Sequence, residues 1–169
     1  MAIVTTVNET AFTQSAEQVY DFVSNPANWP QAYPGSVHEE GLTQASPLKI
    51  GDTWVETGPR GELYSWHVAI AVRPRVWVCS TFGPIGHVQD GGGGVEGRIT
   101  VQYRFLRPGG NITLFQRTMV VETYKESPMP DSVFASMNPT QSEIYFDNIR
   151  TALEAAPRSE EHTSELQSL

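Results

Sequence analysis

The segment NPTQSEIYFDNIRTALEAA, residues 138–156, carries the clearest structural signal in the chain. Asn138 is a favourable N-cap residue, and Pro139 suits the first helical position, where a missing N–H leaves no hydrogen bond unmade. Apolar residues then recur at three- and four-residue spacing, which gives one apolar face. This face consists of Tyr145, Phe146, Ile149, Ala152 and Leu153. The pattern predicts a long amphipathic helix that must bury this face against another layer of the protein.

Most of the chain before this helix is predicted to be β-strand. Ile3–Phe12 is rich in β-branched residues, as strands are. Six further strands follow, and turns rich in Gly and Pro separate most of them. Their predicted ranges are Ser36–Leu42, Gly51–Thr57, Leu63–Val72, Val76–Phe82, Val95–Phe105 and Asn111–Glu122. Strands joined by such short turns form an antiparallel meander, and a sheet of this kind twists and curves.

Two short helices are predicted after the first strand. Ser15 can cap the first helix, with Gln18 as its capping-box partner, and Pro26 ends it. A second short helical turn is predicted over Ala27–Trp29, and Tyr124–Asn138 is predicted to be a covering loop or a broken helix. The predicted fold class is therefore α+β, with a curved antiparallel seven-stranded sheet wrapped around a long C-terminal helix.

Length and composition set the broad class. With 169 residues the chain can form one domain with its own core, which we assign to residues 1–157. The single cysteine, Cys79, excludes an internal disulfide and fits a reducing, cytoplasmic location. A net charge of −8 argues against nucleic acid and anionic membranes as partners. No apolar run is long enough to span a membrane, and the N-terminus has no secretion signal.

The last twelve residues, RSEEHTSELQSL (158–169), are polar and show no helical periodicity. They resemble the translation of a common sequencing-library adapter. We expect an assembly artefact joined to a truncated environmental gene, and an ordinary disordered acidic tail is the alternative. In both cases the segment is excluded from the predicted domain.

The predicted order of strand, two short helices, six strands and long helix resembles the helix-grip (SRPBCC) superfamily, which includes Bet v 1 proteins, START domains and polyketide cyclase/dehydrase proteins. The resemblance covers Ile3 to about Ala155. It is carried by FTQSAEQVYDFVSNPANWP (12–30), IGDTW (50–54), VAIAVRPRVWV (68–78) and NIRTALE (148–154). It implies a deep cavity between the sheet and the last helix that binds a hydrophobic or aromatic small molecule. Some members carry or sense this ligand and others cyclise, dehydrate or hydrate it, so an activity must be argued from the polar residues of the cavity.

Strand alternation selects the polar side chains that could face such a cavity. In the predicted strand Gly51–Thr57, Glu56 shares a face with Trp54. If Trp54 faces inward, burial disfavours the charged carboxylate of Glu56 and raises its pKa toward general acid–base catalysis. If Thr53 and Val55 face inward instead, Glu56 lies in water.

Other candidates come from the later strands and the last helix. Gln116 shares a face with Leu114, and an amide there could orient a ligand carbonyl or phenol, or else bond to a neighbouring strand. Tyr103 and Tyr145 follow apolar faces, so either hydroxyl could bind a ligand oxygen, and plain core packing is the alternative. Trp66 is predicted to point inward as a stacking surface or a core filler.

These arguments give two sets of candidate residues. The predicted catalytic set is Glu56, Gln116 and Tyr103, and the predicted ligand-binding set is Trp54, Trp66, Tyr145, Ile149 and Leu114. No metal site is predicted, because the histidines lack ligand spacing, and no cofactor motif occurs.

Two functions from different classes remain open. One is a cofactor-free cyclase, dehydratase or related lyase that acts on an aromatic or polyketide-like substrate. The other is a non-catalytic carrier or sensor of a hydrophobic small molecule. A buried carboxyl group with a raised pKa beside a second polar group favours the enzyme, and a purely aromatic and aliphatic lining favours the carrier. The sequence leaves open the identity of the ligand and the oligomeric state, a homodimer included.

Overall fold

The computed structural model describes residues 1–42, 47–86, 94–109 and 112–155 of the chain. Its strands form one antiparallel sheet in the order β1-β7-β6-β5-β4-β3-β2. The strands are β1 (Ile3–Phe12), β2 (His38–Glu40), β3 (Thr53–Thr57), β4 (Leu63–Val72), β5 (Val76–Ile85), β6 (Val95–Gly109) and β7 (Ile112–Thr123). The helices are α1 (Ala16–Val23), the 3-10 turn η1 (Pro26–Asn28), α2 (Trp29–Ala32), α3 (Asp131–Ser136) and α4 (Pro139–Ala155).

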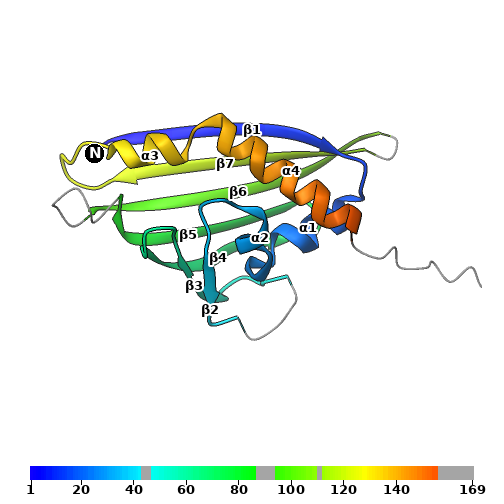
Figure 1. Cartoon of the computed structure of the whole chain (residues 1–169), viewed down its shortest axis with the longest axis horizontal. Helices are drawn as coiled ribbons and strands as arrows, with labels where there is room; N and C mark the ends of the chain where they lie inside the picture. The colour runs from blue at the N-terminus through cyan, green and yellow to red at the C-terminus, as the bar shows by residue number, and fades with distance from the viewer. Residues whose placement is uncertain (43–46, 87–93, 110–111, 156–169) are drawn as a thin grey trace, which may run out of the picture.

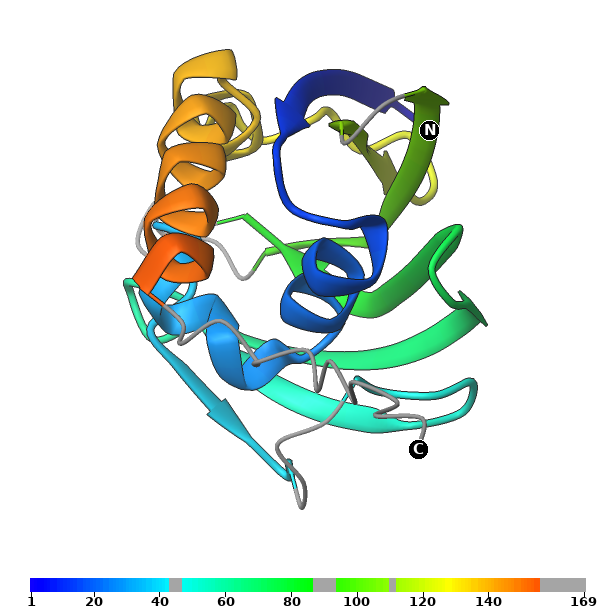
Figure 2. The same cartoon turned by 90° about the vertical axis from the view of Figure 1, so that its right-hand side faces the viewer.

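The helices lie on one side of a strongly curved sheet (Figures 1 and 2). The last helix, α4, contacts α1, α2 and β1. This arrangement confirms the predicted α+β architecture, in which a seven-stranded sheet wraps around a long C-terminal helix. Among the described residues, no helix is both long enough and apolar enough to cross a membrane. The predicted tail, Arg158–Leu169, lies outside the described residues.

Local signals explain where α1 and α4 begin. The Ser15 hydroxyl accepts a hydrogen bond from the Gln18 N–H at 3.2 Å, and the Gln18 side chain accepts one from the Ser15 N–H at 2.9 Å. This is the predicted capping box. At the start of α4, the Asn138 side chain accepts a hydrogen bond from the Thr140 N–H at 3.0 Å. Both helix starts are therefore fixed by residues within one turn.

The second helical segment is longer than the sequence predicts. The helical turn predicted over Ala27–Trp29 corresponds to η1, and α2 then continues to Ala32. Pro30 lies in the first turn of α2, where its missing N–H requires no partner. The Trp29 indole donates to the Val23 carbonyl at 2.9 Å, which anchors α2 against the end of α1.

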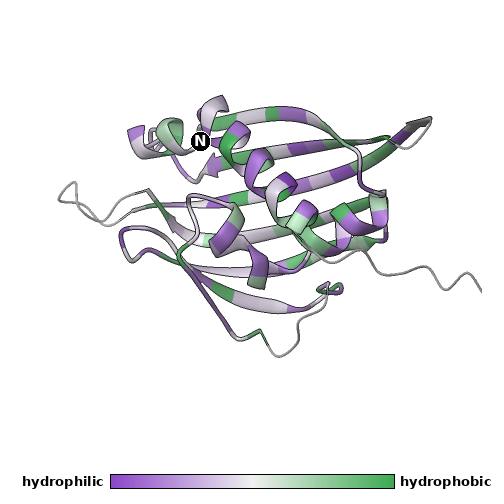
Figure 3. Ribbon diagram, turned by 45° about the vertical axis from the view of Figure 1, so that its right-hand side comes forward, coloured by the Kyte–Doolittle hydropathy of each residue, from purple (hydrophilic) through white to green (hydrophobic). Residues whose placement is uncertain are grey.

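Strand faces mostly follow the hydrophobic pattern, and a bulge in β4 interrupts it. Hydrophobic and polar residues alternate along much of the sheet (Figure 3). In β4 the register shifts between Val68 and Ile70, and such a bulge reverses the faces beyond it. Ile70 and Val72 are therefore 42% and 48% exposed, whereas Ala71 packs against the core. Strict alternation along β4 would place Ile70 and Val72 on the inward face of Trp66, and the bulge prevents this.

The core lies between the concave face of the sheet and the helices. On α4, Tyr145, Phe146 and Ile149 are buried, as the apolar spacing predicts. A cluster of four tryptophans fills the side near α2, where Trp29 lies edge-on to the three others at centroid distances of 5.4–6.2 Å. The other members are Trp54, Trp66 and Trp77. Edge-to-face contacts of this kind add to the stabilisation from buried area, and they fix the orientation of Trp66.

Candidate ligand-binding cavity

A cavity of about 380 Å³ lies within the concave side of the sheet. Strands β6 and β7 line it with Ile99, Val101, Tyr103, Arg117, Met119 and Val121, and β3 and β4 line it with Glu56, Tyr64 and Trp66. Its cover consists of residues 33–35 after α2, several residues of α3, and Gln141 of α4. The predicted broken helix before α4 is therefore α3, and α3 covers the cavity more than α4 does.

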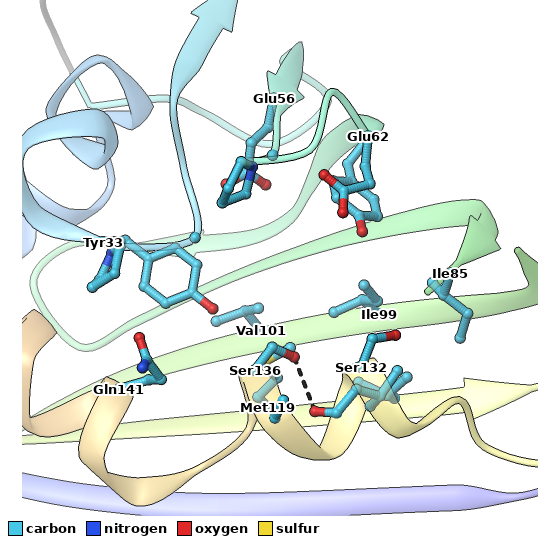
Figure 4. A pocket seen from close by; sticks show the side chains of 18 of the residues that line it. Tyr33, Glu56, Glu62, Ile85, Ile99, Val101, Met119, Ser132, Ser136 and Gln141 are labelled. Carbon is cyan, nitrogen blue, oxygen red and sulfur yellow. Dashed lines mark hydrogen bonds between the residues drawn. The ribbon is translucent and has the colours of Figure 1, made fainter. Parts of the chain in front are cut away.

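The lining is apolar in the middle and polar at its two sides (Figure 4). Val101 and Ile99 lie between Glu56 on one side and the polar residues of the cover on the other. Ser136 donates a hydrogen bond to the Val133 carbonyl at 2.9 Å, so its hydroxyl is already used. The hydroxyl oxygen of Ser132 is buried and has no hydrogen-bond partner among the described residues. The cavity can therefore surround an apolar body and still offer hydrogen bonds to it.

Glu56 faces the cavity from β3, together with a buried Trp54, and is 4% exposed. The Trp66 indole donates to Glu56 Oε2 at 2.7 Å. Burial raises the pKa of Glu56 from 4.5 to about 7, although the Trp66 hydrogen bond and the charge of Arg117 act in the opposite direction. Of the two orientations that the sequence left open, the structure therefore has the inward one.

A second carboxyl group, on Glu39, lies behind Glu56. The two residues are directly opposite each other in the pairing of β2 with β3. The Ser36 hydroxyl donates to Glu39 Oε1 at 2.5 Å. Burial raises the pKa of Glu39 to about 8, and the nearby Glu56 adds to the rise. Two coupled carboxyl groups so placed resist losing both protons, so the pair holds a proton near neutral pH.

Sequence reasoning did not select Glu39, because its significance depends on a strand pairing. The short strand β2 was predicted within Ser36–Leu42, but its register against β3 cannot be read from either strand alone. The sequence offered one signal: Glu39 lies in a predicted strand that is followed along the chain by the predicted strand carrying Glu56.

Arg117 is the second functional residue that the sequence did not select. It lies on the inward face of β7 and is 4% exposed. Its guanidinium carbon lies 5.0 Å from the centre of the Tyr33 ring and 5.6 Å from that of Tyr145. Its Nη2 is 3.6 Å from the sulfur of Met119, a weak acceptor, and its Nε has no hydrogen-bond partner in the described part of the chain. The cavity therefore contains a buried positive charge.

The prediction that Gln116 and Leu114 face the cavity is wrong. Gln116 lies on the outer face of the sheet, where its Nε2 donates to Glu9 Oε1 at 2.5 Å. The inward face of β7 consists of Thr113, Phe115, Arg117, Met119, Val121 and Thr123. Both faces of β7 carry apolar residues, so alternation alone does not decide which face is inward.

The other predicted residues divide into two groups. Trp66 and Tyr103 line the cavity, whereas Trp54, Tyr145 and Ile149 are buried but are not among its lining residues. The Tyr145 hydroxyl donates to the Tyr103 hydroxyl at 3.4 Å. Burial raises the pKa of Tyr103 well above 10 and that of Tyr145 to about 12, so both phenols are neutral near pH 7. Tyr145 therefore supports Tyr103 from behind, and only Tyr103 is placed to meet a ligand.

The described residues contain no group of three or more His, Cys, Asp or Glu side chains that could hold a metal ion. The functional groups of the cavity include carboxyl, guanidinium, phenol, indole, hydroxyl and amide groups. Together they can exchange a proton and donate hydrogen bonds to a ligand oxygen, and they surround an apolar surface.

Several solved structures are similar to this chain, at low sequence identity. Ara h 8.0201 gives a TM-score of 0.65 at 11% identity, over 92% of this chain and 100% of that one. Norcoclaurine synthase from Thalictrum flavum, solved in complex with dopamine and hydroxybenzaldehyde, gives 0.63 at 14% identity, over 93% and 90%. A START superfamily protein from Mycobacterium smegmatis gives 0.60 at 14% identity, over 89% and 97%.

No protein-family model matches the sequence, and a search of curated proteins gives no match. Structural similarity at these identities establishes the fold and not the activity. The three structures cover 89–93% of this chain. The chain therefore has the helix-grip fold of the Bet v 1-like and START-like (SRPBCC) proteins.

Proposed function

We propose that the protein binds a hydrophobic or aromatic small molecule in this cavity and that Glu56 acts on it as a general acid or base. The reaction class would be a cofactor-free cyclisation or dehydration. The observation that carries the proposal is the Glu56 carboxyl group, which lines an otherwise largely apolar cavity with a pKa of about 7. A carboxyl group with this pKa can both accept and donate a proton near neutral pH.

Each neighbouring group has a separate task in this proposal. The Trp66 indole holds the Glu56 carboxyl in place and presents an aromatic surface to the ligand. Glu39 is not among the lining residues and acts as a positioning residue, because it lies directly opposite Glu56 in the pairing of β2 with β3 and the charge of Glu56 raises its pKa. Tyr103 is a neutral phenol that can donate a hydrogen bond to a ligand oxygen.

The proton balance of a dehydration fits one carboxyl group acting twice. The Glu56 carboxylate removes a proton from a carbon next to a carbonyl group, and the carbonyl oxygen takes the negative charge. The resulting carboxylic acid then returns the proton to the departing hydroxyl group, which leaves as water. Hydrogen bonds from Tyr103 to the developing oxyanion would favour the first step.

The aromatic class of ligand has support from a structure of the same fold. Norcoclaurine synthase was solved with dopamine and hydroxybenzaldehyde, which are both aromatic. In the present chain, Trp66, Tyr64 and Tyr103 supply aromatic surfaces around an aliphatic floor. A flat molecule can stack on such surfaces without any change in the core.

A non-catalytic carrier is the second candidate, and the apolar floor of Ile99, Val101 and Met119 favours it. Glu56→Gln separates the two functions. Purified protein is incubated with aromatic β-hydroxy ketones and β-diketones, and products are followed by mass spectrometry. The proposal expects turnover that Glu56→Gln abolishes while affinity stays within a few-fold. Unchanged turnover in Glu56→Gln would remove Glu56 from the mechanism, and binding without turnover in the wild type would leave the carrier.

A further inference from the structure

Arg117 has no counter-ion among the residues that the structure describes. No carboxylate in those ranges forms an ion pair with it, although other arginines there do form such pairs. Those pairs are all more exposed than Arg117, which is 4% exposed and lines the cavity. Its polar neighbours are neutral, namely the Met119 sulfur and the Tyr103 hydroxyl. The arginine therefore differs from the surface arginines in being both buried and without an opposite charge.

A buried arginine without a counter-ion lowers the free energy of unfolding of the ligand-free protein. Burial removes the hydration of the guanidinium, and arginine does not lose its proton to escape the penalty. The faces of Tyr33 and Tyr145 offset part of the penalty through cation–π attraction. An apolar side chain of similar length would fit the same place without a charge. The charge is therefore best explained by a group that enters the cavity.

Glu56 does not act as the missing counter-ion. It lines the same cavity from β3, but the two side chains are not among the ion pairs of the described residues. Arg117 has the smallest of the four main effects on the pKa of Glu56, which burial raises despite it. The Glu56 carboxyl is hydrogen-bonded to Trp66 and coupled to Glu39 instead. The guanidinium is therefore left for an anion that arrives with a ligand.

We propose that Arg117 is an anion-binding site inside the cavity, and that the ligand is a planar apolar molecule carrying one carboxylate or similar organic anion. The inference rests on the proposed function, because it places this ligand in the same cavity. The Nε and Nη2 atoms form one edge of the guanidinium, where Nη2 meets the Met119 sulfur and Nε has no partner among the described residues. A carboxylate binds to such an edge through two parallel hydrogen bonds. The apolar body of the ligand then lies over the floor of Ile99 and Val101.

Two fluorescent probes test this site, because they differ only in an anionic group. The first is 1-anilinonaphthalene-8-sulfonate, and the second is N-phenyl-1-naphthylamine, which lacks the sulfonate. Both are titrated into the wild type, Arg117→Met and Arg104→Met. Arg104 lies on the exposed face of the adjacent strand β6, opposite Gln116, so its replacement removes the same charge away from the cavity.

Arg117→Met is expected to weaken binding of the sulfonate probe about 10- to 100-fold, the range for a charge-assisted hydrogen bond. Binding of the neutral probe should stay within about twofold, which also shows that the cavity is intact, and Arg104→Met should change neither probe. An unchanged affinity for the sulfonate in Arg117→Met would overturn the anion site, and so would an equal loss for both probes. If neither probe binds the wild type, the proposed function fails as well.

Discussion

Replacing Glu56 by glutamine should make the protein more stable at high pH and leave its stability unchanged at low pH. In the folded protein burial raises the pKa of Glu56 from 4.5 to about 7. A carboxyl group with a raised pKa in the folded state destabilises that state once it must ionise. The penalty is absent well below pH 4.5, where Glu56 is protonated in both states, and it grows between pH 4.5 and about 7 and levels off above that. Glutamine cannot ionise, so the variant escapes the penalty.

The size of the effect follows from the difference between the two pKa values. The pKa rises from 4.5 to about 7, and each unit corresponds to 1.36 kcal/mol, so the full penalty is roughly 3 kcal/mol. The Trp66 indole can still donate to the oxygen of a glutamine side chain, so the present hydrogen bond at 2.7 Å need not be lost. For a chain of this size, roughly 3 kcal/mol corresponds to about 6–12 °C in Tm.

The assay is urea denaturation followed by circular dichroism, for wild type and Glu56→Gln, at pH 4.5, 6, 7 and 8. The matched control is Glu154→Gln, because Glu154 is an exposed carboxylate on α4. We expect the stability curves of the wild type and of Glu56→Gln to lie close together near pH 4.5, to separate between pH 4.5 and 7, and to run nearly parallel between pH 7 and 8. A difference that is the same at every pH would refute the reasoning, because it would mean that Glu56 titrates alike in the folded and unfolded chains.

Three further experiments, with four substitutions, test other parts of the structure. Arg117→Met should raise the free energy of unfolding of the ligand-free protein by about 1–2 kcal/mol in urea denaturation, because it removes a buried charge that lacks a counter-ion; a large destabilisation would make the arginine structural. Trp66→Phe removes a hydrogen bond that favours the ionised form of Glu56, so the pKa of Glu56, followed by carboxyl ¹³C NMR, should rise above about 7, and a fall would contradict the assigned contact. Phe115→Ala should destabilise the protein by about 3–5 kcal/mol and Gln116→Ala by less than about 0.5 kcal/mol in the same denaturation assay. The reverse order would mean that the other face of β7 points inward.

The sequence predicted the starts of α1 and α4 and the clearly alternating strand β6 because these signals are local. The capping box at Ser15 and the cap at Asn138 each involve residues within one turn. In β6 the apolar residues fall mainly on one face, so Tyr103 was placed inward correctly. The fold follows from such segments and from their order along the chain.

The candidate site was only partly predictable because two of its groups depend on contacts between distant segments. Glu39 becomes important only through the register of β2 against β3. In β7 both faces carry apolar residues, so the face of Leu114 and Gln116 was predicted to be inward and Arg117 was missed. A buried charge without a counter-ion breaks the usual pattern, and functional sites are where such exceptions concentrate.

The central claim is that the cavity binds an aromatic ligand, and its most direct test uses the methyl groups of the four methionines as NMR reporters. Met119 lines the cavity, whereas Met1, Met129 and Met137 are not among its lining residues. Protein labelled with ¹³C-methyl methionine is titrated with 2-naphthoate, and Met119→Leu assigns the signal. We predict a saturable shift of the Met119 methyl signal with little change at Met1. A Met119 signal that stays unmoved at saturating naphthoate would contradict the claim that this interior receives a ligand.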